Sequence, residues 1–125
     1  MEINIGLPWP PSTNHYWRHG IVAGKPRIFL GKKGKDFRAE VLRQCQIMRI
    51  GGLRLTGRLA VTLTLSPPTR AKCDLANYEK STIDALQVAK VYVDDSQIDD
   101  LRLIRGPVVK GGRVDVKISV IPPTP

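Results

Sequence analysis

Apolar and polar residues alternate along several segments of the chain, a period of two that is typical of half-buried strands. The alternation is clearest at residues 59–66 and 113–121, and it is shorter at residues 2–7 and 98–104. A further short strand is predicted at residues 26–30. The pattern therefore predicts five strands, with the longest in the second half of the chain.

Two other segments follow the helical period of 3.6 residues. The first, residues 34–50, ends at the pair Gly51-Gly52. Its buried face is expected to carry Phe37, Val41, Leu42, Cys45 and Met48. The second, residues 75–89, follows Asp74, whose carboxylate suits the N-cap because it can accept hydrogen bonds from free backbone N–H groups. Its buried face is expected to carry Leu75, Tyr78, Thr82, Ala85, Leu86 and Ala89.

The order of these elements, β-β-α-β-α-β-β, predicts one small α+β domain over residues 1–125, with a mixed β-sheet and two main helices. The turn at Lys110-Gly111-Gly112 predicts a hairpin between the last two strands. The proline-rich tail at residues 122–125 is expected to be disordered. No apolar run approaches the roughly 20 residues that span a bilayer, and no signal peptide is visible. We therefore expect a cytoplasmic protein with no membrane partner.

Residues 8–12 end the first strand because consecutive prolines remove ladder donors, and residues 13–19 then mix aromatic side chains with histidines and Arg18. The aromatic rings could stack on nucleobases while Arg18 binds a phosphate. Packing fits this proline-rich context better, with a small satellite cluster formed by Trp9, Tyr16 and Trp17. Residues 20–25 are then predicted to form a glycine-containing turn.

Charge is distributed unevenly along a chain whose net charge is +9. Residues 74–100 contain seven acidic and two basic side chains, a net charge of −5, and the rest of the chain carries +14. A basic body attracts nucleic acids independently of their sequence. The acidic segment is either a solvated helix and turn or a site for a divalent cation, which prefers oxygen ligands. A cation site inside a basic body suits a nuclease.

The acids of this segment flank the second helix, with Asp74 before it and Asp94-Asp95 after it. If the chain returns like a hairpin, these carboxylates converge and can hold a metal ion against a scissile phosphate. Lys80 would then neutralise charge that develops on the phosphate. The alternatives are structural: Asp74 as an N-cap, and Asp94-Asp95 as a solvated turn. Composition and spacing alone leave both interpretations open.

The same residues carry a family resemblance. Asp74-Leu75-Ala76-Asn77 with Lys80, followed by Asp84-Ala85-Leu86 and Val93-Asp94-Asp95-Ser96-Gln97, resembles the core of the RusA family of Holliday junction resolvases. Leu7-Pro8-Trp9-Pro10-Pro11-Ser12 with Asn14 and Arg18 resembles its N-terminal motif, and Val109-Lys110-Gly111-Gly112-Arg113 resembles its C-terminal hairpin. The similarity extends over nearly the whole chain in the same order.

This resemblance implies a RusA-like fold and a homodimeric endodeoxyribonuclease of phages and prophages. Such enzymes act in DNA recombination and repair on four-way junction DNA rather than on a small-molecule substrate. They require Mg²⁺ or Mn²⁺ and cut two strands symmetrically near the crossover.

The resemblance also implies roles for single residues. The family's metal-binding aspartates correspond to Asp74, Ala76 and Asp95, and its essential lysine corresponds to Lys80. Asp94 is a further candidate ligand beside Asp95.

DNA contacts are expected from Arg18 and Lys80 as well as from the residues that lead into the core motif. A basic residue stands just before that motif in a relative, but Cys73 occupies the position here. We therefore expect Arg70 and Lys72 to supply that contact instead.

Ala76 departs from the family pattern, because a methyl group cannot ligate a cation. Either the chain is an inactivated form of an otherwise complete enzyme, which we favour, or it is a protein that binds junctions without cutting them. A third possibility is an RNA-binding or ribosome-associated domain, which explains the basic charge but leaves the arrangement of Asp74 and Asp95 unexplained.

Overall fold

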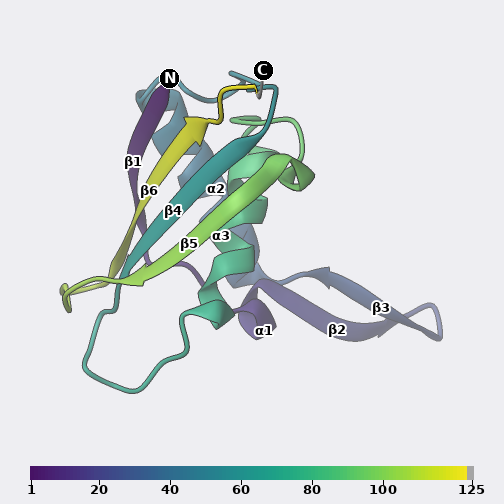
Figure 1. Ribbon diagram of the computed structural model, residues 1–125. Helices are drawn as coiled ribbons and strands as arrows, with labels where there is room; N and C mark the ends of the chain where they lie inside the picture. Colours follow the sequence, from purple (N-terminus) through teal and green to yellow (C-terminus); the bar gives the residue numbers. More distant parts are fainter. Residues whose placement is uncertain (124–125) are drawn as a thin grey trace.

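The computed structural model describes residues 1–123 and places a four-stranded sheet against two helices, with a two-stranded hairpin projecting from one side (Figure 1). The main sheet consists of β1 (Glu2–Pro8), β4 (Leu59–Ser66), β5 (Ile98–Arg105) and β6 (Arg113–Val120). The projecting hairpin consists of β2 (Trp17–Val22) and β3 (Lys25–Leu30). The helices are α1 (Thr13–Tyr16), α2 (Lys32–Ile47) and α3 (Ala76–Val88), and a 3-10 turn, η1 (Asp95–Gln97), precedes β5.

The predicted α+β class, mixed sheet and two main helices are confirmed. The strand order is β1-β6-β4-β5, in which β6 is antiparallel to both β1 and β4 while β5 is parallel to β4. Leu63 of β4, for example, lies opposite Val116 of β6 and Leu103 of β5. Strand β4, which has the strongest alternation in the sequence, is thus paired on both sides and buries every second residue.

The predicted hairpin between the last two strands is wrong, because β4 lies between β5 and β6. The connection instead crosses the end of β4. The backbone N–H of Gly106 donates to the carbonyl of Leu65 (2.8 Å), and that of Val109 donates to the carbonyl of Pro67 (2.9 Å). A glycine-rich turn signal identifies a change of direction but not which strands become neighbours.

Helices α2 and α3 cover one face of the sheet and pack against each other (Figure 1). The buried stripe of α2 contains Gly34, Phe37, Val41 and Cys45. Leu42 and Met48 were also expected there, but their exposed fractions are 40% and 52%. Leu42 lies about 100° around the helix from Val41 and therefore beside the stripe. Met48 comes after α2, which ends at Ile47 rather than at the predicted residue 50.

Residues 13–22 contain two elements that the sequence did not predict, α1 and β2. The expected turn at 20–25 is shorter, because Gly20, Ile21 and Val22 continue β2 and the turn itself is Ala23-Gly24. Glycine inside a strand weakens the local strand signal. Tyr16 is completely buried in the main core rather than in a satellite cluster.

At the C-terminal end, the chain leaves the sheet after Val120. Of the tail expected to be disordered, residues 124–125 lie outside the described residues. No helix within residues 1–123 is long and apolar enough to cross a membrane.

Candidate active site

Helix α3 is the element around which the predicted site residues are arranged. Asp74 lies just before it, and its carboxylate accepts a hydrogen bond from the backbone N–H of Ala76 (3.1 Å), while its carbonyl accepts from the N–H of Asn77 (3.1 Å). The expected capping interaction therefore exists, although Leu75 occupies the N-cap position itself. Asp74 and Ala76 are both exposed, so a longer side chain at position 76 has room.

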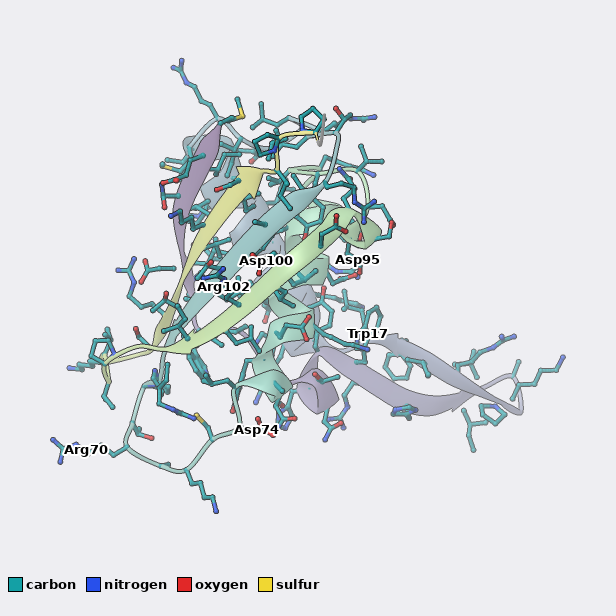
Figure 2. All side chains as sticks on the ribbon, viewed as in Figure 1. Trp17, Arg70, Asp74, Asp95, Asp100 and Arg102 are labelled. Atoms are coloured by element: carbon teal, nitrogen blue, oxygen red, sulfur yellow. The ribbon has the colours of Figure 1, made fainter. Side chains whose placement is uncertain are left out.

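The loop that leads into α3 carries the basic residues expected to contact DNA. Arg70 and Lys72 are exposed on it, and Arg70 points away from the body (Figure 2). The loop is tethered to the end of β5, because the Arg105 guanidinium donates to the carbonyl of Cys73 (2.9 Å). The Sγ atom of Cys73 lies 3.3 Å from a guanidinium nitrogen of Arg105, so the Cys73 side chain faces the end of β5.

Asp94 and Asp95 lie in a tight turn, where Asp94 is the N-cap and Asp95 the first residue of η1. The Asp94 carboxylate accepts a hydrogen bond from the backbone N–H of Ser96 (3.0 Å), and the Gln97 side chain accepts one from the Asp94 N–H (2.8 Å), which forms a capping box. The hydrogen bonds from Ser96 lower the pKa of Asp94. The Asp95 N–H donates to the side chain of Gln87 (2.9 Å), which fixes this turn beside the end of α3.

Within one chain, Asp74 and Asp95 do not converge as expected. Asp74 precedes the first residue of α3, whereas Asp95 is bonded to Gln87 near its last residue. A helix of 13 residues is about 20 Å long, and Figure 2 shows the two aspartates at its opposite ends. Two ligands of one cation are at most about 5 Å apart, so one chain cannot place both on the same ion.

A pocket runs along α3 between these two ends. It brings Lys80 and Asp95 together, and its lining residues are Trp17, Glu79, Lys80, Ile83, Asp84 and Asp95. The sequence did not single out Glu79 as a site residue, and it assigned Asp84 only to the family motif. Lys80 and Asp84 are four residues apart and so lie on one side of α3, which was the available signal for Asp84.

Asp84 joins the three helices through a polar network. Its carboxylate accepts hydrogen bonds from the Tyr16 hydroxyl of α1 and from the Arg38 guanidinium of α2 (2.7 Å). Arg38 also donates to the Tyr16 oxygen (2.7 Å) and lies 5.5 Å and 5.6 Å from the ring centres of Tyr16 and Trp17. Burial, and next the bond to Asp84, raise the pKa of Tyr16 well above its usual range. This network fixes α3 beside the pocket.

The N-terminal proline-rich segment supports the beginning of α3. The Ser81 hydroxyl donates to the carbonyl of Pro11 (2.8 Å), and the Trp9 and Tyr78 rings are 4.7 Å apart. The Thr13 hydroxyl donates to the carbonyl of Asn77 (3.1 Å). Trp9 thus packs against Tyr78, while Tyr16 lies in the main core and contacts Trp17 edge to face, so Trp9, Tyr16 and Trp17 do not form the separate cluster that the sequence predicted.

The acids do not form a complete cation site in one chain. Within residues 1–123, no group of three or more His, Cys, Asp or Glu side chains lies close enough together to hold a metal ion. Asp74 has no second carboxylate in its own turn because position 76 is alanine.

The amino-acid sequence is similar to those of known endodeoxyribonucleases. The profile of the family described as Endodeoxyribonuclease RusA matches residues 8–119. The crossover junction endodeoxyribonuclease rusA of Enterobacteria phage 82 is 35% identical over 118 residues, covering 93% of this chain and 92% of the relative. The crossover junction endodeoxyribonucleases RusA of Shigella sonnei (strain Ss046) and Escherichia coli (strain K12) are each 34% identical over 117 residues, with the same coverage.

Proposed function

The chain belongs to the RusA family of endodeoxyribonucleases, and on that premise we propose that it is a crossover junction endodeoxyribonuclease, a hydrolase of DNA phosphodiester bonds that acts on four-way junctions. The observation that carries the proposal is the retention of Asp74, Lys80 and Asp95 along one helix of a strongly basic chain. Neither an RNA-binding role nor a purely structural one requires this combination.

Catalysis in this proposal depends on a divalent cation, Mg²⁺ or Mn²⁺. When bound, such an ion activates water and stabilises the leaving oxygen of the phosphodiester. Asp74 and Asp95 are the residues that would hold it, with Asp94 beside them. Asp94 is the weaker candidate, because its carboxylate already caps the turn through Ser96.

A homodimer completes the site in this proposal. Because Asp74 and Asp95 lie at opposite ends of a helix about 20 Å long, each cation requires Asp74 from one protomer and Asp95 from the other. A two-fold axis then produces two equivalent sites, which suits a substrate that is cut in two strands.

Mixing two defective variants tests this arrangement. In a background with aspartate at position 76, Asp74→Asn and Asp95→Asn are each expected to abolish cleavage. Their mixture should recover cleavage, because a heterodimer contains one site with both acids and one with neither. In the control, each homodimer is chemically cross-linked before the two variants are mixed, so that protomers cannot exchange. Recovery in that control, or none in the free mixture, would contradict a site shared between protomers.

The basic residues bind the DNA. Lys80 lines the pocket with Asp95 and is suited to the scissile phosphate. Arg70 and Lys72 extend from the loop beside Asp74 and are suited to the backbone of the flanking duplex. Arg18 lies on the projecting hairpin, next to Trp17, which lines the same pocket as Lys80.

Ala76 favours a second candidate function, junction binding without cleavage. The chain lacks one family carboxylate, so binding and cutting are separable in this protein. Both functions share the same DNA interface and differ only at the metal site.

Competition binding tests the shared premise. A labelled four-way junction is bound to the protein at moderate salt without divalent metal, and unlabelled junction, linear duplex of the same length and structured RNA are added as competitors. The junction is expected to compete best. Equal competition by duplex would contradict selectivity for junctions, and stronger competition by RNA would favour an RNA-binding domain.

A further inference from the structure

The hairpin of β2 and β3 stands apart from the rest of the molecule (Figure 1). Its two strands pair with each other in a separate two-stranded sheet, and nearly every residue from 21 to 29 is exposed. Ile21 and Ile28 have exposed fractions of 77% and 65%. An isolated two-stranded ribbon is only marginally stable in water, so a binding partner would stabilise it.

The strand register gives this ribbon two chemically different faces, because directly opposed residues of paired strands lie on the same face. One face is cationic and carries the pairs Arg18–Phe29, Gly20–Arg27 and Val22–Lys25. The other is apolar and carries Trp17–Leu30, His19–Ile28 and Ile21–Pro26.

Phe29 lies at the centre of the cationic face. A side chain at Gly20 would lie 2.7 Å from the Phe29 ring, so the ring crosses β2 where glycine leaves room for it. Phe29 is opposite Arg18 and two residues along β3 from Arg27, on the same face, and its exposed fraction is 46%. The face thus combines an exposed aromatic ring with flanking positive charges.

The cationic face continues into a pocket at the base of the hairpin. Its lining residues are His15, Arg18, Phe29, Leu30, Gly31, Lys32, Lys33 and Lys35. Residues 17–35 contain six lysine and arginine residues and no acid. Within residues 1–123, Lys32 is the one of these six that forms an ion pair, with Asp36 (2.8 Å). The surface therefore concentrates positive charge, and within residues 1–123 only the charge of Lys32 is compensated by an ion pair.

We propose that the cationic face of the β2–β3 hairpin, together with the pocket at its base, binds one duplex branch of the four-way junction outside the acidic site. We call this protein surface the arm. This inference rests on the proposed function. The charge is complementary to a phosphate backbone, and the major groove of duplex DNA admits a two-stranded β-ribbon. Contacts of this kind fix orientation without reading sequence, as a structure-selective enzyme requires.

Neutralising the arm tests the proposal. The variant Lys25→Gln/Arg27→Gln removes two exposed charges from the hairpin, and Arg54→Gln/Lys90→Gln removes two exposed charges elsewhere as a matched control, because none of these four residues forms an ion pair within residues 1–123. Affinity for a four-way junction is measured by fluorescence anisotropy across a salt series without divalent metal. In the arm variant, the slope of log affinity against log salt should decrease by about 2, with weaker binding at every salt concentration. The control should keep the parent slope.

A second variant, Phe29→Ala, separates the ring from the charge. It is expected to weaken junction binding while the salt slope stays at the parent value, because the lost contact is not ionic. Thermal unfolding followed by circular dichroism checks that each variant remains folded.

Each alternative outcome has a distinct meaning. If the arm variant matches the control in both affinity and slope while the parent binds junctions, the arm proposal is overturned and the proposed function stands. If the parent itself does not prefer junctions, the proposed function fails. If sedimentation shows that the arm variant changes from dimer to monomer, the hairpin contacts a second copy of the chain and the DNA proposal is overturned.

Discussion

At the scale of single residues, the neighbouring acids Asp94 and Asp95 have different roles. The Asp94 carboxylate caps η1 through Ser96, whereas for the Asp95 carboxylate the structure gives no hydrogen bond within residues 1–123. Acids that are already engaged stabilise the fold, and acids that are not can bind a ligand. The sequence placed both in a turn but could not separate these roles, which depend on which oxygen faces which backbone N–H.

We therefore expect Asp94→Ala to lower the urea midpoint of unfolding and Asp95→Ala to leave it nearly unchanged. The fold raises the acidity of Asp94, so its stabilising effect is present above the ordinary pKa and is lost as pH falls through its lower folded pKa. The difference between parent and Asp94→Ala should accordingly shrink below about pH 4. The midpoints are measured by urea unfolding of the parent and both variants at pH 7 and pH 3. Equal midpoints for all three proteins at pH 7 would show that the Asp94 cap does not stabilise the fold.

The Tyr16 hydroxyl has a second residue-scale role, as a donor to Asp84 inside the network that joins α1, α2 and α3. Tyr16→Phe keeps the buried ring and removes that donor, so it should lower the free energy of unfolding by about 1.5 kcal/mol. Tyr78→Phe is the matched control, because the structure gives its hydroxyl no hydrogen bond within residues 1–123. If Tyr78→Phe lowers the free energy of unfolding as much as Tyr16→Phe does, the hydrogen-bond network is not the cause of the loss.

At the scale of elements, the sequence predicted those whose pattern is set by burial. Strands β4 and β6 bury every second residue, and α3 buries one face, so their periods were visible. Strand β2 was missed because it is exposed on both faces and contains Gly20. The pairing of β5 with β4 could not be predicted from a turn signal, because neighbouring strands are chosen by the packing of the whole sheet.

The entry of α2 is an element-scale contact that a substitution can test. A Cβ atom at Gly34 would lie 2.7 Å from the carbonyl oxygen of Tyr16 and 2.8 Å from Leu30. Alanine normally improves a helix by about 1 kcal/mol over glycine, but here the clash with backbone should dominate and give a net loss of about 1–2 kcal/mol. Gln46→Ala, on the exposed side of α2, should change stability by less than about 0.5 kcal/mol. Stabilisation by Gly34→Ala in urea unfolding would contradict the close packing.

At the scale of the whole molecule, the charge distribution and the position of α3 explain why the sequence could propose candidate site residues but could not predict how they are arranged. Charge and motif spacing pointed to Asp74, Lys80 and Asp95. Their expected convergence failed because Asp95 follows α3 directly and lies beside Gln87 at the far end of the helix. Only β5, which comes after Asp95, carries the chain back to the loop before α3. A site shared between protomers leaves no trace in the spacing of one sequence.

We propose that this chain is a junction-cutting enzyme that lacks one carboxylate, at position 76. The most direct measurement is cleavage of a labelled four-way junction by Ala76→Asp, with and without Mg²⁺, beside the parent and beside Ala76→Asp/Asp74→Asn. We expect paired, Mg²⁺-dependent nicks for Ala76→Asp, and little or no cutting by the other two proteins. If Ala76→Asp binds the junction as well as the parent but does not cut it, the chain is not an enzyme that merely lacks this carboxylate.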